Sequence, residues 1–242
     1  MNYYGKTDIG KKRAENQDCF GYKELDSMTL LAVCDGMGGA NGGATASKLA
    51  LDSFLAICER DLAKDMPENQ IRNVLSLAAS DANSAVFKAA KQNPELSGMG
   101  STLVAALVTE TDSFIVNVGD SRAYTLACGE LEQVSHDHSY VQFLLDLGKI
   151  TPEEAEVHPE KNVITKAVGV SETLKADVDR LEIENPSYIL LCSDGLTGRV
   201  KDDEIKAVLS EASSVEAKVD KLVDMANENG GDDNITVLIA EL

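Results

Sequence analysis

A long hydrophobic run is missing from this chain. No stretch of its 242 residues approaches the roughly 18 uninterrupted apolar residues that a membrane-spanning helix needs. The first residues also lack the apolar core of a secretory signal peptide. We therefore expect a soluble cytoplasmic protein that has no membrane as a partner.

Positive charge is also scarce. The chain has 22 Lys and Arg against 41 Asp and Glu, which leaves a formal net charge of −19 at pH 7. Such a protein repels the phosphate backbone of nucleic acids over most of its surface. Nucleic acid is therefore excluded as an expected partner.

Paired cysteines are absent as well. The five cysteines show no CxxC spacing; they are Cys19, Cys34, Cys58, Cys128 and Cys192. Most have apolar neighbours, which predicts buried thiols that stay reduced, as in the cytosol.

Internal repeats, low-complexity tracts and linker-like breaks are also missing. With 43% hydrophobic residues, a chain of this length can bury a full core. We expect one domain over residues 1–242. Because no heptad seam is evident, a monomer is the expected state.

Six apolar, β-rich segments predict strands. They are Met28–Cys34, Ser101–Thr109, Ser113–Val118, Ala123–Cys128, Tyr188–Cys192 and Ile235–Ala240. Three of them follow one another with only short polar breaks, which favours an antiparallel meander over parallel α/β pairing.

Two pairs of segments carry apolar residues at helical spacing. They are Gly43–Ala63 with Pro67–Gln92, and Asp202–Ala212 with Val215–Asn227. Pro67 is expected at the first helical position. Strands interrupted by helix pairs predict an α+β domain with sheets inside and helices outside.

The segment from Asp137 to Val168 differs from the rest, because Gly148, Pro152 and Pro159 interrupt its short helical pieces. We expect a mobile flap over the site at about residues 139–168. An ordinary packed helical hairpin is the alternative.

Four short acidic motifs stand beside glycine, asparagine or serine near apolar runs. They are Asn16-Gln17-Asp18, Asp35-Gly36-Met37-Gly38-Gly39, Ser193-Asp194-Gly195 and Asp232-Asp233-Asn234. Hard oxygen ligands of this kind favour Mg²⁺ or Mn²⁺ over zinc. Asp35 and Asp194 each follow an apolar strand, so two such strands side by side would bring their carboxylates together.

Eight motifs occur in one order along nearly the whole chain: Arg13-Ala14-Glu15-Asn16-Gln17-Asp18, Asp35-Gly36-Met37-Gly38-Gly39, Gly100-Ser101-Thr102, Gly119-Asp120-Ser121-Arg122-Ala123-Tyr124, Asp137-His138-Ser139, Ile164-Thr165-Lys166-Ala167-Val168-Gly169, Ser193-Asp194-Gly195-Leu196 and Asp233-Asn234-Ile235-Thr236. In this order they resemble the metal-dependent type 2C protein serine/threonine phosphatases, the PPM family, in their compact bacterial form. The resemblance implies a four-layer α-β-β-α sandwich, in which antiparallel helix pairs flank two antiparallel β-sheets.

The resemblance also implies a metal centre. Asp35 would bridge two Mn²⁺ or Mg²⁺ ions, with the Gly36 carbonyl on one ion. Asp194 and Asp233 would bind the other ion. Asp120, together with Asp194, would hold a third and weaker ion.

Further residues would support the ions. Asp18 would hold metal-bound water, Asn234 would orient its neighbours, and Arg13 would bind the substrate phosphate with its planar guanidinium. Two positions depart from the family pattern. Met37 stands where some members have a proton-donating histidine, and Gln17 stands where many eukaryotic members have a glutamate near the second ion.

The three histidines have no cysteine or further histidine nearby at zinc-ligand spacing. His136 and His138 would share one face of an extended strand, which leaves zinc as a weak alternative. We expect His138 to anchor the start of the flap by hydrogen bonds and His158 to lie within it. Either histidine could donate the proton to the leaving group.

The implied function is hydrolysis of phosphoserine and phosphothreonine on proteins by water that two ions activate. It would oppose a serine/threonine kinase of the same bacterium. A phosphatase of small phosphate esters and a catalytically silent phosphoprotein-binding scaffold are the alternatives. The complete set of carboxylates argues against the scaffold.

Overall fold

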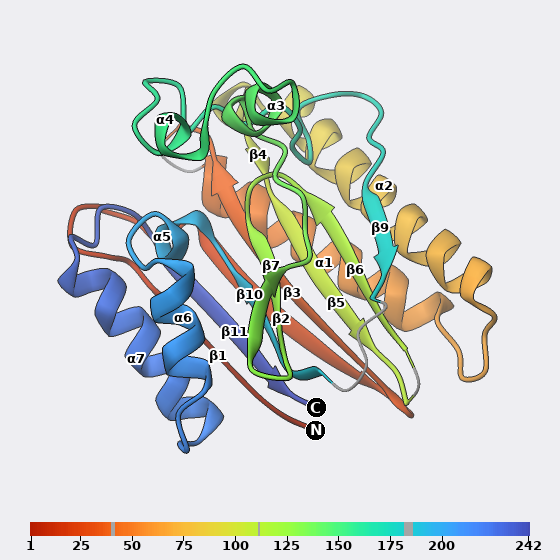
Figure 1. Cartoon of the computed structure of the whole chain (residues 1–242). Helices are drawn as coiled ribbons and strands as arrows, with labels where there is room; N and C mark the ends of the chain where they lie inside the picture. The colour runs from red at the N-terminus through yellow and green to blue at the C-terminus, as the bar shows by residue number, and fades with distance from the viewer. Residues whose placement is uncertain (40–41, 111, 182–185) are drawn as a thin grey trace.

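The computed structural model describes residues 1–39, 42–110, 112–181 and 186–242. Two antiparallel sheets lie face to face, and helices cover both outer faces (Figure 1). The predicted four-layer α-β-β-α sandwich is therefore confirmed. None of the described helices is long and apolar enough to cross a bilayer.

Strand order defines the two sheets. The first sheet runs β1 (Asn2–Asp8), β11 (Ile235–Glu241), β10 (Pro186–Cys192), β7 (Arg122–Ala127) and β8 (Glu130–Gln133). The second runs β2 (Asp18–Leu25), β3 (Met28–Met37), β5 (Leu103–Val108), β6 (Ser113–Val118) and β9 (Asp177–Arg180), with β4 (Gly100–Ser101) paired to β3.

Helix pairs form the outer layers (Figure 1). The second sheet is covered by α1 (Gly42–Asp61) and α2 (Glu68–Gln92), and the first sheet by α6 (Asp202–Leu209) and α7 (Val215–Glu228). Shorter helices are η1 (Pro94–Leu96), α3 (Tyr140–Asp146), α4 (Pro152–Glu156) and α5 (Asp194–Thr197). Pro67 is the N-cap of α2, one residue before the predicted position, because its ψ of 151° is still extended.

The inner strand β3 is apolar without interruption from Leu30 to Cys34 because both of its faces are buried there. Leu30 and Ala32 pack into the core beneath α1 and α2. Leu31 and Val33 face the core between the two sheets. Since side chains alternate along a strand, Asp35 continues the series that points between the sheets.

The predicted meander is wrong at its last step. Strand β5 pairs with β6 as expected, but β7 belongs to the other sheet, where β10 and β8 are its neighbours. The chain crosses between sheets at residues 119–121, where Gly119 has a φ of +104°. This crossing places Asp120 at the junction of the two sheets.

The prediction that the strands before Asp35 and Asp194 lie side by side is also wrong. Strands β3 and β10 lie in opposite sheets and not side by side in one sheet. The carboxylates that follow them therefore approach one another across the sandwich. Four polar or edge strands, β1, β2, β8 and β9, escaped prediction altogether.

The segment predicted as a flap contains α3 and α4, which lie above the ends of both sheets (Figure 1). Ser139 caps α3 by accepting a hydrogen bond from the Gln142 backbone, and Thr151 forms a capping box with Glu154 at α4. No side chain of either helix is fully buried. The mobility of this flap stays a prediction.

Candidate metal centre

Five aspartates converge from separate elements on one end of the sandwich. Asp18 begins β2 and lies directly opposite Asp35 of β3 in the strand register. Asp194 begins α5 immediately after β10. Asp120 lies in the crossing between sheets, and Asp233 lies just before β11. The negative charges of the other four all raise the pKa of Asp35, which shows that they are its neighbours.

Burial sets the electrostatics of this cluster. Burial, more than any neighbour, raises the pKa of Asp18 to about 6 and that of Asp120 to about 7. Burial also raises the pKa of Asp194, and it holds the pKa of Asp35 well above its usual range. Carboxylates brought together away from water favour protonation, unless cations take the place of the protons.

Three carboxylate oxygens in the cluster are buried and have no hydrogen-bond partner: Oδ1 of Asp18, of Asp120 and of Asp194. Buried polar atoms without a partner are rare in folded proteins, and a bound cation can satisfy such oxygens. Together with the all-oxygen donor set, these atoms fit Mg²⁺ or Mn²⁺. Among the described residues, no three His, Cys, Asp or Glu already stand in ligand geometry. The fit therefore rests on donor chemistry and orphaned oxygens.

Asp18 is held firmly by its other oxygen. Ser193 Oγ and Thr236 Oγ1 donate to Asp18 Oδ2 at 2.7 and 2.8 Å. Ser193 directly follows β10 and Thr236 lies in β11, both strands of the first sheet, whereas Asp18 belongs to the second sheet. These bonds join the sheets at the cluster and leave Oδ1 free for another partner.

The backbone around Asp35 is fixed by residues whose role the sequence did not reveal. The Asp35 backbone N–H donates to Thr102 Oγ1 at 2.9 Å, and its carbonyl accepts from Thr102 N and Ser101 Oγ. Thr102 Oγ1 also shares a 2.7 Å hydrogen bond with Ser121 Oγ. The Gly100-Ser101-Thr102 motif was visible in the sequence, but its contact with Asp35 needed the structure.

Glycine is required where strands approach the cluster closely. A Cβ at Gly36 would lie 2.1 Å from the carbonyl oxygen of Gly43 and 2.7 Å from that of Gln17. A Cβ at Gly195 would lie 1.9 Å from the Asn234 carbonyl oxygen. Both Asp-Gly pairs therefore serve close backbone packing, which holds their aspartates in place.

Asn234 ties the N-terminal loop to the cluster. Its Oδ1 accepts from Gln17 N at 2.8 Å, while its Nδ2 donates to the carbonyls of Ile9 and Glu15. The structure therefore places Gln17 beside Asn234 and against α1. The loop that these bonds hold carries Arg13 to the cluster.

Arg13 lies beside Asp233. Its Nη2 donates to Asp233 Oδ2 at 2.6 Å, and the Arg13 side chain is 51% exposed. Asp233 Oδ1 accepts from the Asn234 backbone at 2.8 Å. The guanidinium is thus at the edge of the cluster, with part of it open to solvent.

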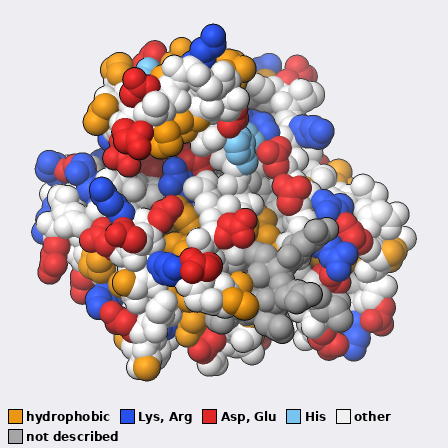
Figure 2. Space-filling view, viewed as in Figure 1, with side chains coloured by type: hydrophobic (Ala, Val, Ile, Leu, Met, Phe, Trp, Pro, Cys, Tyr) orange, Lys and Arg blue, Asp and Glu red, His pale blue; other side chains and the backbone are white. Residues whose placement is uncertain are grey.

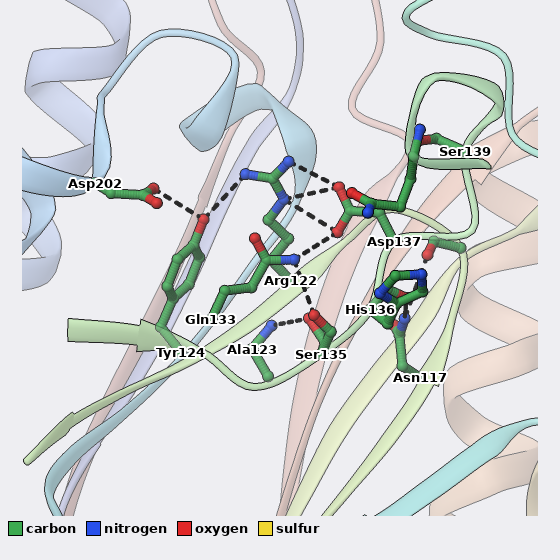
Figure 3. Close-up of polar contacts among 12 residues, drawn as sticks. Asn117, Arg122, Ala123, Tyr124, Gln133, Ser135, His136, Asp137, Ser139 and Asp202 are labelled. Carbon is green, nitrogen blue, oxygen red and sulfur yellow. Dashed lines mark hydrogen bonds and ion pairs between the residues drawn. The ribbon is translucent and has the colours of Figure 1, made fainter. Parts of the chain in front are cut away.

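A second missed feature is a network of polar contacts around Arg122 and Asp137 (Figure 3). Arg122 Nε and Nη2 donate to Asp137 at 2.7 to 3.1 Å, and Gln133 Nε2 adds a 2.8 Å bond to the same carboxylate. Arg122 Nη1 donates to Tyr124 OH, which donates to Asp202. The network joins β7 and β8 to the base of the flap and to α6.

Arg122 also acts on the cluster through its charge. It lowers the pKa of Asp120 and of Asp194, against the larger upward effect of burial. Asp137, its main partner, is only 6% exposed. Arg122 is therefore a half-buried structural cation beside the carboxylates, a role that its place in a hairpin-like motif concealed.

The histidines have separate surroundings. His138 Nδ1 accepts from Gly119 N at 3.0 Å, and its Nε2 lies 3.0 Å from Asp177 and 2.8 Å from Lys166. Burial lowers the pKa of His138. The exposed His136 pairs with Asp146, while the His158 ring lies 6.0 Å from that of Tyr140. The described residues thus give the zinc alternative no support.

A cleft of about 610 Å³ opens between the flap and the start of α6. Asp120 and Asp194 lie on its wall, so it adjoins the carboxylate cluster. Figure 2 shows acidic side chains around the hollow beneath the flap. The cleft is nevertheless mixed in charge, since its lining also includes Arg122, Lys161, Arg199 and Lys201.

Comparisons with known proteins bear on the whole chain. The profile of the protein phosphatase 2C family matches residues 7–238. The serine/threonine phosphatase stp of Listeria welshimeri is 36% identical over 98% of this chain and 94% of its own length. Protein phosphatase PhpP of Streptococcus pneumoniae is 34% identical over 98% of this chain and 95% of its own length.

Solved structures agree. Serine/threonine phosphatase Stp1 from Staphylococcus aureus superposes with a TM-score of 0.92 and 39% identity, over 99% of this chain and 94% of that one. The catalytic domain of serine/threonine protein phosphatase PstP, solved with two manganese ions, gives a TM-score of 0.86 and 34% identity. That match covers 99% of this chain and 97% of the other.

Proposed function

This chain belongs to the protein phosphatase 2C family and is a metal-dependent serine/threonine protein phosphatase, and we propose that its five converging aspartates hold the catalytic ions. The single observation that carries this proposal is the set of orphaned buried oxygens on Asp18, Asp120 and Asp194. Their pKa values, which burial and then the neighbouring aspartates raise, give a second reason, because divalent cations can neutralise the buried carboxylates that protons otherwise neutralise.

Each ligand has a proposed place. Asp35 and the Gly36 carbonyl would hold one Mn²⁺ or Mg²⁺ ion, and Asp35 with Asp194 and Asp233 would hold the other. Asp120 would contribute to a third, weaker site with Asp194. When bound, such ions supply an activated water and stabilise negative charge on the phosphoryl group. Asp18, fixed by Ser193 and Thr236, is placed to accept a proton from water at its free Oδ1.

Arg13 is proposed to orient the phosphate of the substrate. A guanidinium can donate two parallel hydrogen bonds to phosphate oxygens, and that of Arg13 is half exposed at the edge of the cluster. Its bond to Asp233 uses Nη2, so other N–H groups stay available. The loop held by Asn234 therefore sets where the phosphate binds.

Arg13→Ala is expected to lower kcat/KM for a phosphothreonine peptide about 10-fold to 100-fold, since hydrogen bonds to charged groups contribute about 1.5–3 kcal/mol. Arg13→Lys should recover only part of the loss, because an ammonium lacks the planar fork. Steady-state kinetics check this, with Arg60→Ala as the control, because Arg60 is an exposed arginine that pairs with Asp61. Mn²⁺ affinity is measured in parallel. A loss explained wholly by weaker Mn²⁺ binding would contradict the phosphate role and assign Arg13 to holding Asp233.

Phosphoproteins are the substrates of this enzyme, and we propose that they include targets of a cognate bacterial serine/threonine kinase. We also propose that the chain acts as a monomer, with residues 1–242 as one catalytic domain, in the cytoplasm. The five cysteines form no disulfide, which suits that compartment. No contact within the described part of the cluster favours small phosphate esters or a silent scaffold over phosphoprotein hydrolysis.

The net charge of −19 leads to a prediction about sequence around the phosphorylated residue. Phosphopeptides with basic flanks should show a kcat/KM about 10-fold higher than matched peptides with acidic flanks, because long-range attraction raises the encounter rate. The difference should shrink as salt is added. Assays of phosphate release at low and high ionic strength measure kcat/KM for both kinds of peptide. Equal rates for both peptides at low salt would refute the prediction.

The proposed function is tested by phosphate release from a phosphothreonine peptide near neutral pH. We expect release with Mn²⁺ and a loss on the order of 10³-fold or more with EDTA, since metal ions contribute several kcal/mol to phosphoryl transfer. Nucleotides and small esters serve as comparison substrates. A folded, Mn²⁺-loaded protein that released no phosphate from the peptide would contradict the proposal. Faster hydrolysis of the small esters than of the peptide would indicate that small phosphate esters are the substrates instead.

A further inference from the structure

Cys19 and Cys34 lie directly opposite each other in the antiparallel pair of β2 and β3. In the same register, Gly36 N donates to the carbonyl of Gln17, which marks that pair as hydrogen-bonded. Hydrogen-bonded pairs alternate along an antiparallel ladder, so the Cys19 and Cys34 pair, two residues further on, is also hydrogen-bonded. The Cα atoms of such a pair are about 5.5 Å apart. Disulfides span Cα separations of about 4.4–6.8 Å, so the backbone already satisfies this requirement.

The two thiols are also in contact. Each lies within reach of a side-chain hydrogen bond to the other, and Ser47 adds a contact to Cys19. Cys34 is fully buried, whereas Cys19 is partly exposed. Oxidation would therefore begin at Cys19, the member of the pair that is not fully buried, and the second sulfur is held beside it. Cys58 and Cys192 are buried without such a partner in the described structure.

The pair lies on the chain next to the carboxylate cluster. Cys19 follows Asp18 and Cys34 precedes Asp35, and these two aspartates are themselves paired in the register. Because side chains alternate along a strand, the thiols point toward α1 while the carboxylates point between the sheets. Any change in the spacing of the two cysteines is thus passed through one peptide unit on each strand to both aspartates.

We infer that Cys19 and Cys34 form a peroxide-sensitive dithiol, and that their disulfide lowers phosphatase activity by displacing Asp18 and Asp35. The consequence for activity rests on the proposed metal ligands, whereas the disulfide itself does not. Bond formation brings the sulfurs from hydrogen-bond contact to about 2.05 Å. Mg²⁺ requires near-ideal octahedral geometry, so small displacements of its ligands are costly.

The chemistry balances with hydrogen peroxide as the oxidant. The thiol of Cys19 reacts with one peroxide oxygen, the O–O bond breaks, and a sulfenic acid and one water form. The sulfur of Cys34 then attacks the sulfur of Cys19, the S–OH bond breaks, and a second water leaves. Two thiols are oxidised by two electrons to one disulfide, and the peroxide is reduced to two waters. A dithiol reductant reverses the change.

The test begins with a Cys128→Ser background, because Cys128 is the exposed thiol that would join two molecules. EDTA-treated protein is exposed to hydrogen peroxide, catalase removes the excess, and Mn²⁺ is added afterwards. Mass spectrometry of a non-reducing digest should show the Cys19 and Cys34 peptides joined. Mn²⁺ affinity by calorimetry and activity should each fall about 10-fold, as for changes beside metal ligands, and dithiothreitol should restore both.

Cys19→Ser and Cys34→Ala in the same background serve as matched controls. Both should keep their Mn²⁺ affinity and activity after peroxide, which separates the disulfide from oxidation of methionine. A treated parent protein that shows no cross-link overturns the dithiol, whatever its activity. A complete cross-link with unchanged Mn²⁺ affinity and activity overturns the switch. An untreated parent protein that lacks Mn²⁺-dependent activity would instead indicate failure of the proposed function, and the cross-link would still decide the dithiol.

Discussion

Asp35→Asn is expected to lower Mn²⁺-dependent phosphatase activity on the order of 10³-fold or more while making the metal-free protein more stable. The loss of activity follows from the central place of Asp35, since its carboxyl has four aspartates as neighbours. An amide oxygen binds divalent cations far less well than a carboxylate, and the ions contribute several kcal/mol to the reaction.

The gain in stability follows from the elevated pKa values. Burial raises the pKa of Asp18 from 3.8 to about 6, and that of Asp120 to about 7. The folded state then binds more protons than the unfolded state between pH 4 and pH 7, so the free energy of unfolding falls as pH rises through this window. The Asp35 side chain lowers the pKa of Asp18 and of Asp194, and the amide of asparagine supplies neutral N–H donors to such carboxylates without needing a proton.

Thermal or urea unfolding in EDTA at about pH 5 and about pH 7.5 measures this effect. At the higher pH the variant should be more stable than the wild type, because it removes a carboxyl whose pKa burial and four neighbouring aspartates hold well above its usual range. The difference should narrow at the lower pH, and Mn²⁺ should stabilise only the wild type. Asp65→Asn is the matched control, because Asp65 is exposed and its φ of 62° suits asparagine. A variant less stable than wild type in EDTA at both pH values would contradict this electrostatic explanation.

Local pattern predicted the layers well because the core strands are buried on both faces. The continuous apolar runs of β3 and β10 can only be accommodated inside a covered sandwich, and the helix pairs carry one apolar face each. The same reasoning failed for β1, β2, β8 and β9. Their residues alternate between polar and apolar or are mostly charged, as expected of edge strands or strands with glycine.

Which sheet a strand joins was not readable from the sequence. The short break between β6 and β7 is compatible with a hairpin, and only the packing of both sheets shows that it is a crossing. The acidic residues were identified from their motifs, but their long-range partners were not. Thr102 contacts Asp35, and Asp137 contacts Arg122, but the partners lie far apart in the sequence. No local spacing therefore predicts these contacts.

The second large effect concerns Arg122, whose substitution by methionine is expected to destabilise the fold by about 3 kcal/mol, the lower end of the range for buried pairs, because its side chain is 29% exposed. Removing one partner of a buried pair leaves the other charge without compensation. Here Asp137, which is 6% exposed, would keep only the bond from Gln133 among the residues that the structure describes. Asp120 and Asp194 would lose the nearby cation that lowers their pKa values, so Mn²⁺-free protein should suffer most.

Urea unfolding of Arg122→Met with and without Mn²⁺ tests this, with Arg180→Met as the control. Arg180 also pairs with two acids, Asp112 and Glu68, but it is 43% exposed, and exposed ion pairs contribute about 0–1 kcal/mol. Adding Asp137→Asn to Arg122→Met should recover part of the stability, because it removes the stranded charge. Equal losses of stability for the two arginine variants, or no recovery of stability in the double variant, would contradict this role. The Arg122–Asp137 pair would then not be what joins the base of the flap to the metal centre.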